Sequence, residues 1–371
     1  MKIGTDQYNT FDTMTMDCWN DRVYYEGKEF PAGHFATEIL NFAGVIHDPL
    51  LERITVLTAL VDDLSTAEKS KRHDIASQLK PLLRNTVSWL YTCPPFCYCE
   101  EQRAYGALVH ALSEERLDRD YEEEEAHLPY LALSFCEPIL RSLVAIYNFC
   151  LLIRAFEMKY LRGSKQRNAD AFAKAAHECF DEDDSFLILL EQMPFGGVEE
   201  FFSYPRVITG FNYFQDENDE EKWKTAQRVI CKRAIDFYVF DLMNGLHHGH
   251  APSQCQGCGR YFLTTNGYIP KYCDGVAPQD DRYTCRQYGA MMHQKEQNKQ
   301  HPVYRLFNTR TGTIRKHHQR GKISDDLRRE ALYLAGSYRD KALMDNDYAA
   351  DGYARDMELE HIYAEAEKRL K

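Results

Sequence analysis

Apolar residues recur at helical spacing through most of the chain. Such runs begin at about Phe35 and continue through Leu50–Leu60 and Ile75–Leu90, and they predict amphipathic helices. The most apolar stretch, Leu131–Ala155, is interrupted by charged residues such as Glu137, so it lacks the roughly 20 uninterrupted apolar positions of a membrane span. It predicts a buried core helix.

Two further segments flank these helical runs. Residues Arg22–Phe30 alternate around Glu26-Gly27, which predicts a short hairpin near the N-terminus. Residues 221–246 predict a further helix that leads into a cysteine-rich segment.

The last quarter of the chain predicts four more helices, separated by residues that stop helices. Pro302 breaks the pattern, Gly321 ends a helix, and Ser324 is a good N-terminal cap for the next one. The predicted helices are 284–299, 303–320, a helix from the Ser324 cap to about Met344, and 347–370.

These patterns predict a mainly α fold in three parts. Residues 1–245 would form an acidic, mainly helical domain with the short hairpin. Residues 246–300 would form a small treble-clef-like module with four cysteines, and 301–371 a basic-to-mixed helical tail. Acidic blocks, including Glu122–Glu125, are expected on solvated loops or helix faces.

Composition refines this prediction only slightly. The 371 residues are 44% hydrophobic and 27% charged, which is typical of globular proteins. The N-terminus shows no secretory signal, so the twelve cysteines are expected to be reduced and the protein cytoplasmic, with no membrane partner. The sequence carries no signal for an oligomeric state.

Charge is distributed unequally between the two ends of the chain. Residues 1–250 carry 25 Lys and Arg against 41 Asp and Glu, whereas residues 251–371 carry 20 against 16. Within 286–329 there are 11 basic and three acidic residues, although the whole chain has a net charge of −12. Such an asymmetry favours contact between the basic part and nucleic acid.

Four cysteines carry the most specific chemical signal. Cys255, Cys258, Cys273 and Cys285 follow the spacing C-x2-C-x14-C-x11-C. A C-x2-C pair can place two thiolates on one ion from a single turn, and Gly259 suits the reversal that such a knuckle needs. Four thiolates predict one structural Zn²⁺ with no open position for catalysis.

Aromatic residues between these cysteines predict the rest of the module. Tyr261-Phe262 and Lys271-Tyr272 would be the two arms of a hairpin that reverses near Asn266-Gly267, with Tyr268 among the small module's stabilising aromatics. Cys285 would lie in the first turn of the next helix, where the dipole favours a thiolate. Nearby cations would offset the charge of the metal centre: Arg260, Lys271, Arg282 and Arg286.

The runs CQGCGRYF, KYCDG and TCRQYGA, followed by a basic helical tail, resemble an uncharacterised bacterial family of unknown function. The resemblance covers about 235–345 and implies no activity. The module is more distantly similar to the CGNR zinc finger of bacterial transcriptional regulators, which implies DNA binding. It departs from that finger because the first cysteine pair is closer, the last two cysteines are eleven residues apart, and the sequence after Cys285 reads Arg-Gln-Tyr.

Two other clusters leave alternatives open. Cys93, Cys97 and Cys99 could hold a second metal or pack as ordinary semi-buried thiols. The histidines of 247–250 could supply a ligand or form a polar turn after a helix.

The basic run supplies the candidate nucleic-acid contacts. Several Lys and Arg on one helix can meet phosphates, but they can also form a solvated face or dock on the acidic N-terminal half. The candidate contacts are Arg286, Arg305, Arg310, Arg315, Lys316, Arg320 and Lys322.

The sequence therefore predicts a zinc-stabilised regulatory protein that binds DNA or RNA through its basic segment, with the acidic domain sensing a ligand or protein partner. The alternative is an interaction or scaffold protein whose zinc module is purely structural. No Walker loop, G-x-S-x-G or H-E-x-x-H motif occurs, so the chain is predicted not to be an enzyme. An active site in the N-terminal half without such a motif is a third hypothesis.

Overall fold

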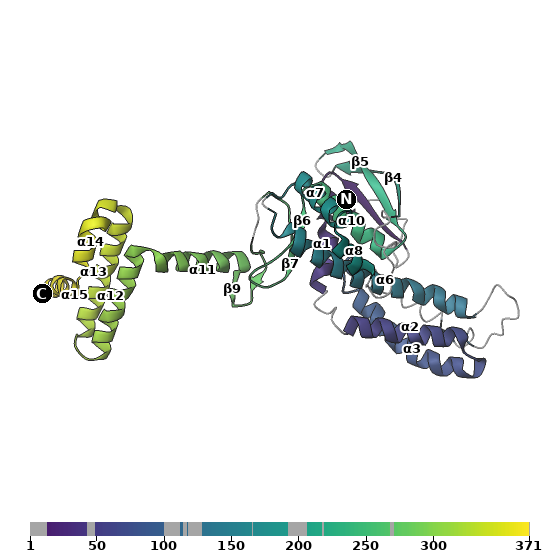
Figure 1. Cartoon of the computed structure of the whole chain (residues 1–371), viewed down its shortest axis with the longest axis horizontal. Coiled ribbons are helices and arrows are strands. Elements are labelled where there is room, and N and C mark those ends of the chain that lie inside the picture. Colours follow the sequence, from purple (N-terminus) through teal and green to yellow (C-terminus); the bar gives the residue numbers. More distant parts are fainter. Residues whose placement is uncertain are drawn as a thin grey trace. The chain divides into compact units, whose positions relative to one another are not determined.

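The computed structural model describes residues 13–42, 49–99, 112–113, 117, 128–164, 166–191, 206–216, 219–267 and 271–370. The predicted acidic block Glu122–Glu125 and Tyr268 lie outside these residues. Contacts divide the chain into two units, Met1–Cys273 (the N-terminal unit) and Asp274–Lys371 (the C-terminal unit). Helix is the main secondary structure of both units (Figure 1).

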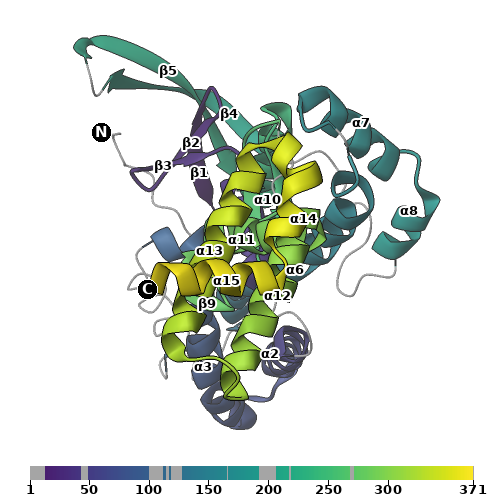
Figure 2. The same ribbon diagram turned by 90° about the vertical axis from the view of Figure 1, so that its left-hand side faces the viewer.

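A five-stranded antiparallel sheet in the N-terminal unit has the strand order β3-β2-β1-β5-β4. The predicted hairpin is present, and Glu26 and Gly27 both have positive φ at its turn. The hairpin is only part of the sheet, because β4 and β5 extend it on the other side of β1 as a long ribbon (Figure 2). The strands are β1 (Met14–Trp19), β2 (Arg22–Tyr25), β3 (Lys28–Pro31), β4 (Val207–Asp216) and β5 (Asp219–Cys231).

The expectation of a helix over 221–246 is therefore wrong in its first half. Strand β5 occupies that half, and helix α10 (Ala234–His247) begins only after it. Strand pairing overrides the helical spacing of the charged residues, because β5 pairs with β4 along its length and with β1 over Gln227–Cys231. Asp17 on β1 faces Arg228 on β5, and their side chains form an ion pair of 2.8 Å.

Most of the other elements among the described residues of the N-terminal unit are helices, in agreement with the apolar spacing. They are α1 (His34–Phe42), α2 (Pro49–Thr66), α3 (Lys69–Leu90), the short η2 (Phe96–Tyr98), α6 (Leu128–Phe156), α7 (Ala169–Phe180) and α8 (Asp184–Glu191). A π-helical turn, η3 (Glu157–Leu161), continues α6.

Helix α6 is the core helix that the apolar stretch predicts. By length and composition, the helical segment Cys136–Leu161 could cross a membrane, but 61% of its most apolar window is buried inside the protein. Leu143, Ile146 and Phe149 are fully buried in a cluster that also contains side chains of α1, α2, α3 and α10. Its apolar surface is thus used for packing within the unit.

Helices α1 and α10 approach each other closely at two glycines. A Cβ atom on Gly245 would lie 2.8 Å from the Cα atom of Gly33, and Gly33 has φ +85°. Beside this contact, the buried carboxylate of Asp241 accepts hydrogen bonds from the backbone N–H groups of Gly33 (3.0 Å) and Ala36 (2.9 Å). Asp241 therefore caps the first turn of α1 from a neighbouring helix.

The C-terminal unit begins with a two-stranded hairpin and continues as helices. The elements are β8 (Val276–Ala277), β9 (Asp280–Thr284), α11 (Cys285–Gln300), α12 (Pro302–Gln319), α13 (Asp325–Met344), η4 (Tyr348–Gly352), α14 (Tyr353–Asp356) and α15 (Leu359–Leu370). Gly321 has φ +66° after α12, and Ser324 Oγ accepts the Leu327 N–H at the start of α13. Both residues act as the sequence predicts.

A second apolar cluster lies within the C-terminal unit, where Ile314 of α12 meets Leu334 of α13 and Ile362 of α15. The expected single helix over 347–370 is broken into η4, α14 and α15. Met357, at the break between α14 and α15, is fully buried in this cluster. Packing of this cluster thus determines where the helices of residues 347–370 begin and end.

Candidate metal centre

The first two cysteines lie in the turn of a short hairpin. Strand β6 (Ala251–Gln254) pairs with β7 (Tyr261–Thr264), and Cys255–Arg260 connects them. Gly259 has φ +74°, a conformation that side chains other than glycine rarely adopt, so its predicted role in the reversal is confirmed. The Gly259 N–H donates to the Cys255 carbonyl at 2.9 Å and closes the turn.

The hairpin arms differ from those expected. Tyr261-Phe262 pairs with 251–254, which precedes the cysteines, and Lys271-Tyr272 forms no strand. The backbone carbonyl of Lys271 instead accepts a hydrogen bond from Gln256 N–H at 2.9 Å. The strand that pairs with Tyr261-Phe262 therefore lies before the first cysteine, in β6. The pattern of aromatic residues did not indicate this partner.

Helix α1 holds the hairpin through a side-chain amide. Asn41 Nδ2 donates to the carbonyl of Tyr261 at 2.9 Å, and the Tyr261 N–H donates to Asn41 Oδ1 at 2.7 Å. The amide thus satisfies both backbone groups of Tyr261 in the way a neighbouring strand would. Arg154 of α6 lies over the ring of Tyr261 at 5.7 Å.

The four sulfur atoms of Cys255, Cys258, Cys273 and Cys285 lie within 4.8 Å of one another. Cys258 Sγ and Cys273 Sγ are 3.7 Å apart, which is too long for a disulfide bond. A tetrahedral ion with metal–sulfur bonds of about 2.3 Å requires sulfur atoms about 3.8 Å apart. The arrangement therefore fits a four-coordinate metal ion, and three of the four cysteines are buried.

Backbone donors favour the thiolate form of Cys255. Its Sγ accepts hydrogen bonds from the N–H groups of Gly257 and Cys273, each at 3.4 Å. Burial raises the pKa of Cys255, but these donors outweigh that effect and lower the pKa from 9.0 to about 7. A thiol that loses its proton near neutral pH is a suitable metal ligand.

Cys285 is the first residue of α11, as the sequence predicts. A reciprocal pair of hydrogen bonds fixes this start: Gln287 N–H donates to Thr284 Oγ1 at 3.2 Å, and Thr284 N–H donates to Gln287 Oε1 at 2.9 Å. This is a capping box, and it places the Cys285 sulfur at the positive end of the helix.

The other two candidate clusters form no comparable group. Within the described ranges, the four cysteines above are the one set of three or more ligand atoms close enough for a metal. Cys93 and Cys99 bond elsewhere: Cys93 Sγ donates to the Trp89 carbonyl (3.6 Å), and Cys99 Sγ bonds Tyr25 Oη (3.2 Å). Buried His250 has its Nδ1 3.0 Å from the Ala32 carbonyl.

The predicted nucleic-acid residues lie in the C-terminal unit. Arg286 is on α11 and forms an ion pair with Asp274 at 3.0 Å. Arg310 is half-buried, and its Nε has no hydrogen-bond partner among the described residues. The remaining five candidates are exposed: Arg305, Arg315, Lys316, Arg320 and Lys322.

Of the four cations expected to offset the metal charge, two are engaged in ion pairs. Arg282 binds Asp280 at 2.7 Å, and Arg286 binds Asp274. Sequence reasoning missed Asn41, Arg154 and Arg167, which surround the hairpin. A polar residue inside an apolar helix, such as Asn41 in α1, was the available signal.

Residues 203–369 match the sequence profile of a family of unknown function (DUF6076). The match supports a relationship with an uncharacterised domain family over the metal centre and the helices that follow it, without specifying the metal motif. Comparisons with curated proteins and with solved structures found no match.

Proposed function

We propose that this protein binds one structural Zn²⁺ and uses the exposed basic face of α12 to bind nucleic acid in a regulatory role. The exposed side chains of Arg305, Arg315 and Lys316 on α12, and of Arg320 directly after it, form this face and support the proposal most directly. A reducing compartment such as the cytoplasm suits the protein, because thiolate ligands are lost when cysteines are oxidised. The 246–300 module and the 301–371 tail would then be functional parts of the chain.

The sulfur geometry supports zinc as the metal. Zinc in structural sites takes four ligands in a tetrahedron, and four thiolates leave no position for an activated water. The metal would therefore stabilise the fold of the module and perform no catalysis. Stability from the metal matters here, because the knuckle and the hairpins bury little apolar surface of their own.

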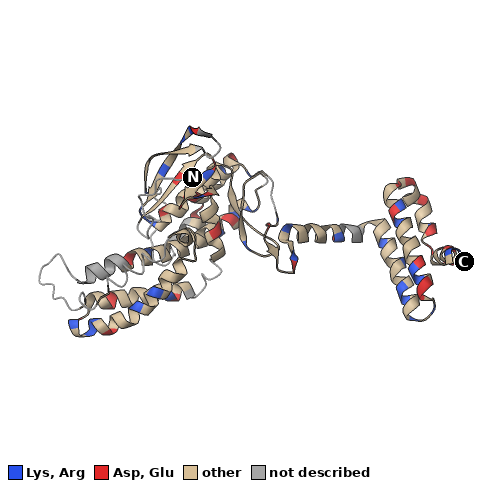
Figure 3. Cartoon of the chain, turned by 180° about the vertical axis from the view of Figure 1, so that it is seen from behind, with Lys and Arg blue, Asp and Glu red and all other residues tan. Residues whose placement is uncertain are grey.

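The charges on α12 support the nucleic-acid proposal. No ion pair within the described part of the chain involves Arg305, Arg315, Lys316, Arg320 or Lys322. By contrast, Arg328 at the start of α13 binds Asp325 at 2.7 Å. Basic residues also recur along the helices of this unit in Figure 3. Cations without carboxylate partners are available to phosphates, and displacement of counterions makes such binding favourable at low salt.

The test replaces Arg315, Lys316 and Arg320 together with Ala in the full-length, zinc-loaded protein. Binding to labelled duplex DNA, single-stranded DNA and RNA is measured by fluorescence anisotropy at several salt concentrations. We expect the variant to bind at least about tenfold more weakly, and the slope of log K against log salt to fall by about 2 to 3.

The matched control removes three positive charges elsewhere, through Lys71→Ala, Lys80→Ala and Lys174→Ala. It produces the same net charge but leaves α12 unchanged, so its binding should remain near that of the wild type. Equal losses in the two variants would mean that only net charge matters. Absence of binding to all three nucleic acids at low salt would exclude the proposal.

A second candidate is a protein-interaction role, favoured by exposed aromatic residues on the β4–β5 ribbon. Phe211, Tyr213 and Trp223 are 74%, 66% and 67% exposed. The register pairs Gln215 with Trp223 and so places all three rings on one face of the ribbon. Contiguous exposed aromatics mark interaction surfaces. In sedimentation velocity, replacing the three with Ser should reduce concentration-dependent association if this candidate is right.

A further inference from the structure

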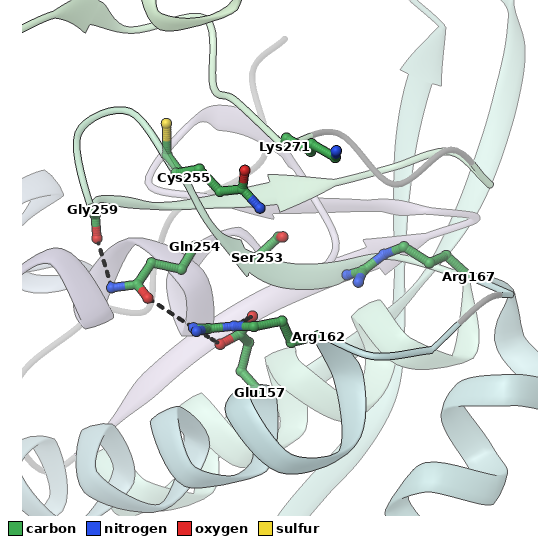
Figure 4. A pocket seen from close by; sticks show the side chains of 9 residues that line it. Glu157, Arg162, Arg167, Ser253, Gln254, Cys255, Gly259 and Lys271 are labelled. Carbon is green, nitrogen blue, oxygen red and sulfur yellow. Dashed lines mark hydrogen bonds and ion pairs between the residues drawn. The ribbon is translucent and has the colours of Figure 1, made fainter. Parts of the chain in front are cut away.

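A pocket of about 390 Å³ lies within the N-terminal unit, between the π-helical turn η3 and strand β6 (Figure 4). The knuckle of the metal centre and the segment before Cys273 complete its wall. The lining residues are Glu157, Arg162, Arg167, Ser253, Gln254, Cys255, Gln256, Gly259 and Lys271. Three of these side chains are cationic and one is anionic.

Arg167 is the most unusual member of this set because it is 4% exposed and has no carboxylate partner in the part of the chain that the structure describes. Its terminal nitrogens donate to neutral acceptors: the carbonyl oxygens of Leu161 (3.2 Å) and Pro252 (3.3 Å), and Thr264 Oγ1 (3.1 Å). Its Nε is buried and has no hydrogen-bond partner among the described residues. A buried charge without a counter-ion is costly, so this guanidinium requires a compensating anion.

The side chain of Arg167 points toward Ser253 and the interior of the pocket in Figure 4. Burial lowers the pKa of Arg167, and the more distant Glu157 opposes that effect only in part. The ring of Phe172, 5.3 Å from the guanidinium carbon, supplies a weak cation–π contact. Neither Glu157 nor the Phe172 ring compensates the charge of Arg167 as an anion in direct contact would.

Arg162 is held in a fixed orientation on another side of the pocket. Its Nη2 donates to Glu157 Oε2 and to Gln254 Oε1, both at 2.7 Å, and Gln254 Nε2 donates to the carbonyl of Gly259 at 3.0 Å. Glu157 neutralises Arg162, so it is not available to neutralise Arg167. Lys271 adds an exposed positive charge at the pocket.

The metal centre contributes negative charge close to this pocket, since zinc with four thiolates carries about −2. Figure 4 shows the sulfur of Cys255 pointing away from Arg162 and Arg167, so the knuckle lines the pocket mainly with its backbone. The two arginines therefore do not serve as direct partners of that thiolate. Their charges remain directed toward the pocket.

We propose that this pocket binds the phosphate group of a small molecule. A phosphate would accept hydrogen bonds from Arg167 Nε, Lys271 Nζ and the Ser253 hydroxyl, which together suit the several oxygens of a phosphate better than the two of a carboxylate. The pocket volume admits a phosphate with a small organic part. This ligand site is separate from the basic face of α12.

The bound group would contact the knuckle and so would also stabilise the metal centre. Gln256 and Gly259 line the pocket, and Gln256 N–H is bonded to the Lys271 carbonyl beside it. A ligand that orders these residues should slow zinc release, because linkage between two sites acts in both directions.

The test uses the full-length, zinc-loaded protein and measures binding of inorganic phosphate and pyrophosphate by isothermal titration calorimetry at constant ionic strength. Succinate is the carboxylate comparison. We expect phosphate or pyrophosphate to bind more tightly than succinate, and Lys271→Gln to weaken that binding about tenfold, as loss of one charged hydrogen bond implies. Zinc release to a chelator should be slower with the ligand present.

Arg167→Gln should abolish binding, but this buried side chain also joins three backbone or side-chain partners, so the exposed Lys271 provides the variant that spares folding. Lys71→Gln on α3 has the same charge change outside the pocket and should bind like the wild type. The proposal would be overturned if neither inorganic phosphate nor pyrophosphate bound. Equal losses of binding in Lys271→Gln and Lys71→Gln would also overturn it. The Arg315, Lys316 and Arg320 triple variant should retain phosphate binding, which separates this result from the nucleic-acid test.

Discussion

At the scale of single residues, Asp241 combines complete burial with two backbone hydrogen bonds at the start of α1. Burial raises the pKa of this carboxyl group from 3.8 to about 7, although the backbone donors oppose the shift. The folded protein therefore binds a proton more tightly at Asp241 than the unfolded chain does. The contribution of protonated Asp241 to the free energy of unfolding is complete below about pH 4 and is lost as the pH rises to about 7.

Replacing Asp241 with Asn should remove this pH dependence. We expect the free energy of unfolding of the wild type, relative to the variant, to fall by up to about 4 kcal/mol between pH 4 and pH 7. Urea unfolding of both proteins at matched pH values measures the difference. Loss of zinc at low pH affects both proteins, so it cancels in the comparison, and a pH-independent difference would contradict the pKa shift.

A second prediction at this scale concerns the zinc content of variants of the four candidate cysteine ligands. Cys285→Ser removes one of four close thiolates and should reduce bound zinc from about one ion per chain to well below it. Zinc content by mass spectrometry checks this. The exposed Cys97, which lies outside the cluster, is the control: Cys97→Ser should retain the full zinc content. Equal zinc content in the two variants would exclude Cys285 as a ligand.

The sequence identified Cys255, Cys258 and Gly259 because a tight C-x2-C turn is a local property of the chain, and it added Cys273 and Cys285 because four thiolates complete a tetrahedral zinc site. It did not identify Asp241, Arg167 or Asn41, whose partners are far away in the sequence. A carboxylate in an apolar helix becomes a cap only when another helix end is packed against it.

At the scale of secondary-structure elements, the start of α11 depends on the capping box of Thr284 and Gln287. A Ser or Thr followed three residues later by Glu or Gln can satisfy two N–H groups that would be unpaired at the N-terminal end of a helix. The box thereby sets which residue begins the helix, and that residue is Cys285.

Gln287→Ala should destabilise the first turn of α11 by about 1 kcal/mol, the typical cost of losing a helix cap. It should therefore increase the rate of zinc release about fivefold. Gln287→Glu retains the acceptor and places a negative charge in the first turn, so it should behave like the wild type. Zinc release to a colorimetric chelator measures both. Identical rates in all three proteins would show that the cap does not support the metal ligand.

Element boundaries set by local signals were predicted closely, and those set by pairing were not. Gly321 and the Ser324 cap defined the junction of α12 and α13 within a residue or two. Strand β5 was missed because its charged first half follows helical spacing, and that half is a strand because it pairs with β4, while β1 pairs with Gln227–Cys231. The β6–β7 pairing was likewise decided by contacts with the knuckle and with Asn41.

At the scale of the whole molecule, each of the two units has an apolar cluster of its own. Neither cluster contains any of the four clustered cysteines. The helices of each unit should therefore keep their stability from apolar packing when the metal is absent.

Removal of zinc with a chelator should accordingly leave most of the helical circular dichroism signal in place. Protease cleavage between Cys255 and Cys285 should increase at least about tenfold, because under the proposed function the metal stabilises this module. Limited proteolysis with mass mapping locates the cuts, and re-addition of zinc should restore protection. A complete loss of helical signal would show that the helices of each unit depend on the metal for their folding.

The sequence by itself determined the four candidate metal-ligating cysteines, the apolar core helix and the boundaries of α11, α12 and α13. The helices depend on interactions among residues a few positions apart, which spacing records directly, and the cysteines are recognised by the residue type and spacing of known metal ligands. Only the tertiary structure decided the five-stranded sheet, the cap from Asp241 and the pocket around Arg167. Each of these brings together residues tens to hundreds of positions apart, and local preference contains no information about which distant partner will satisfy a strand edge or a buried charge.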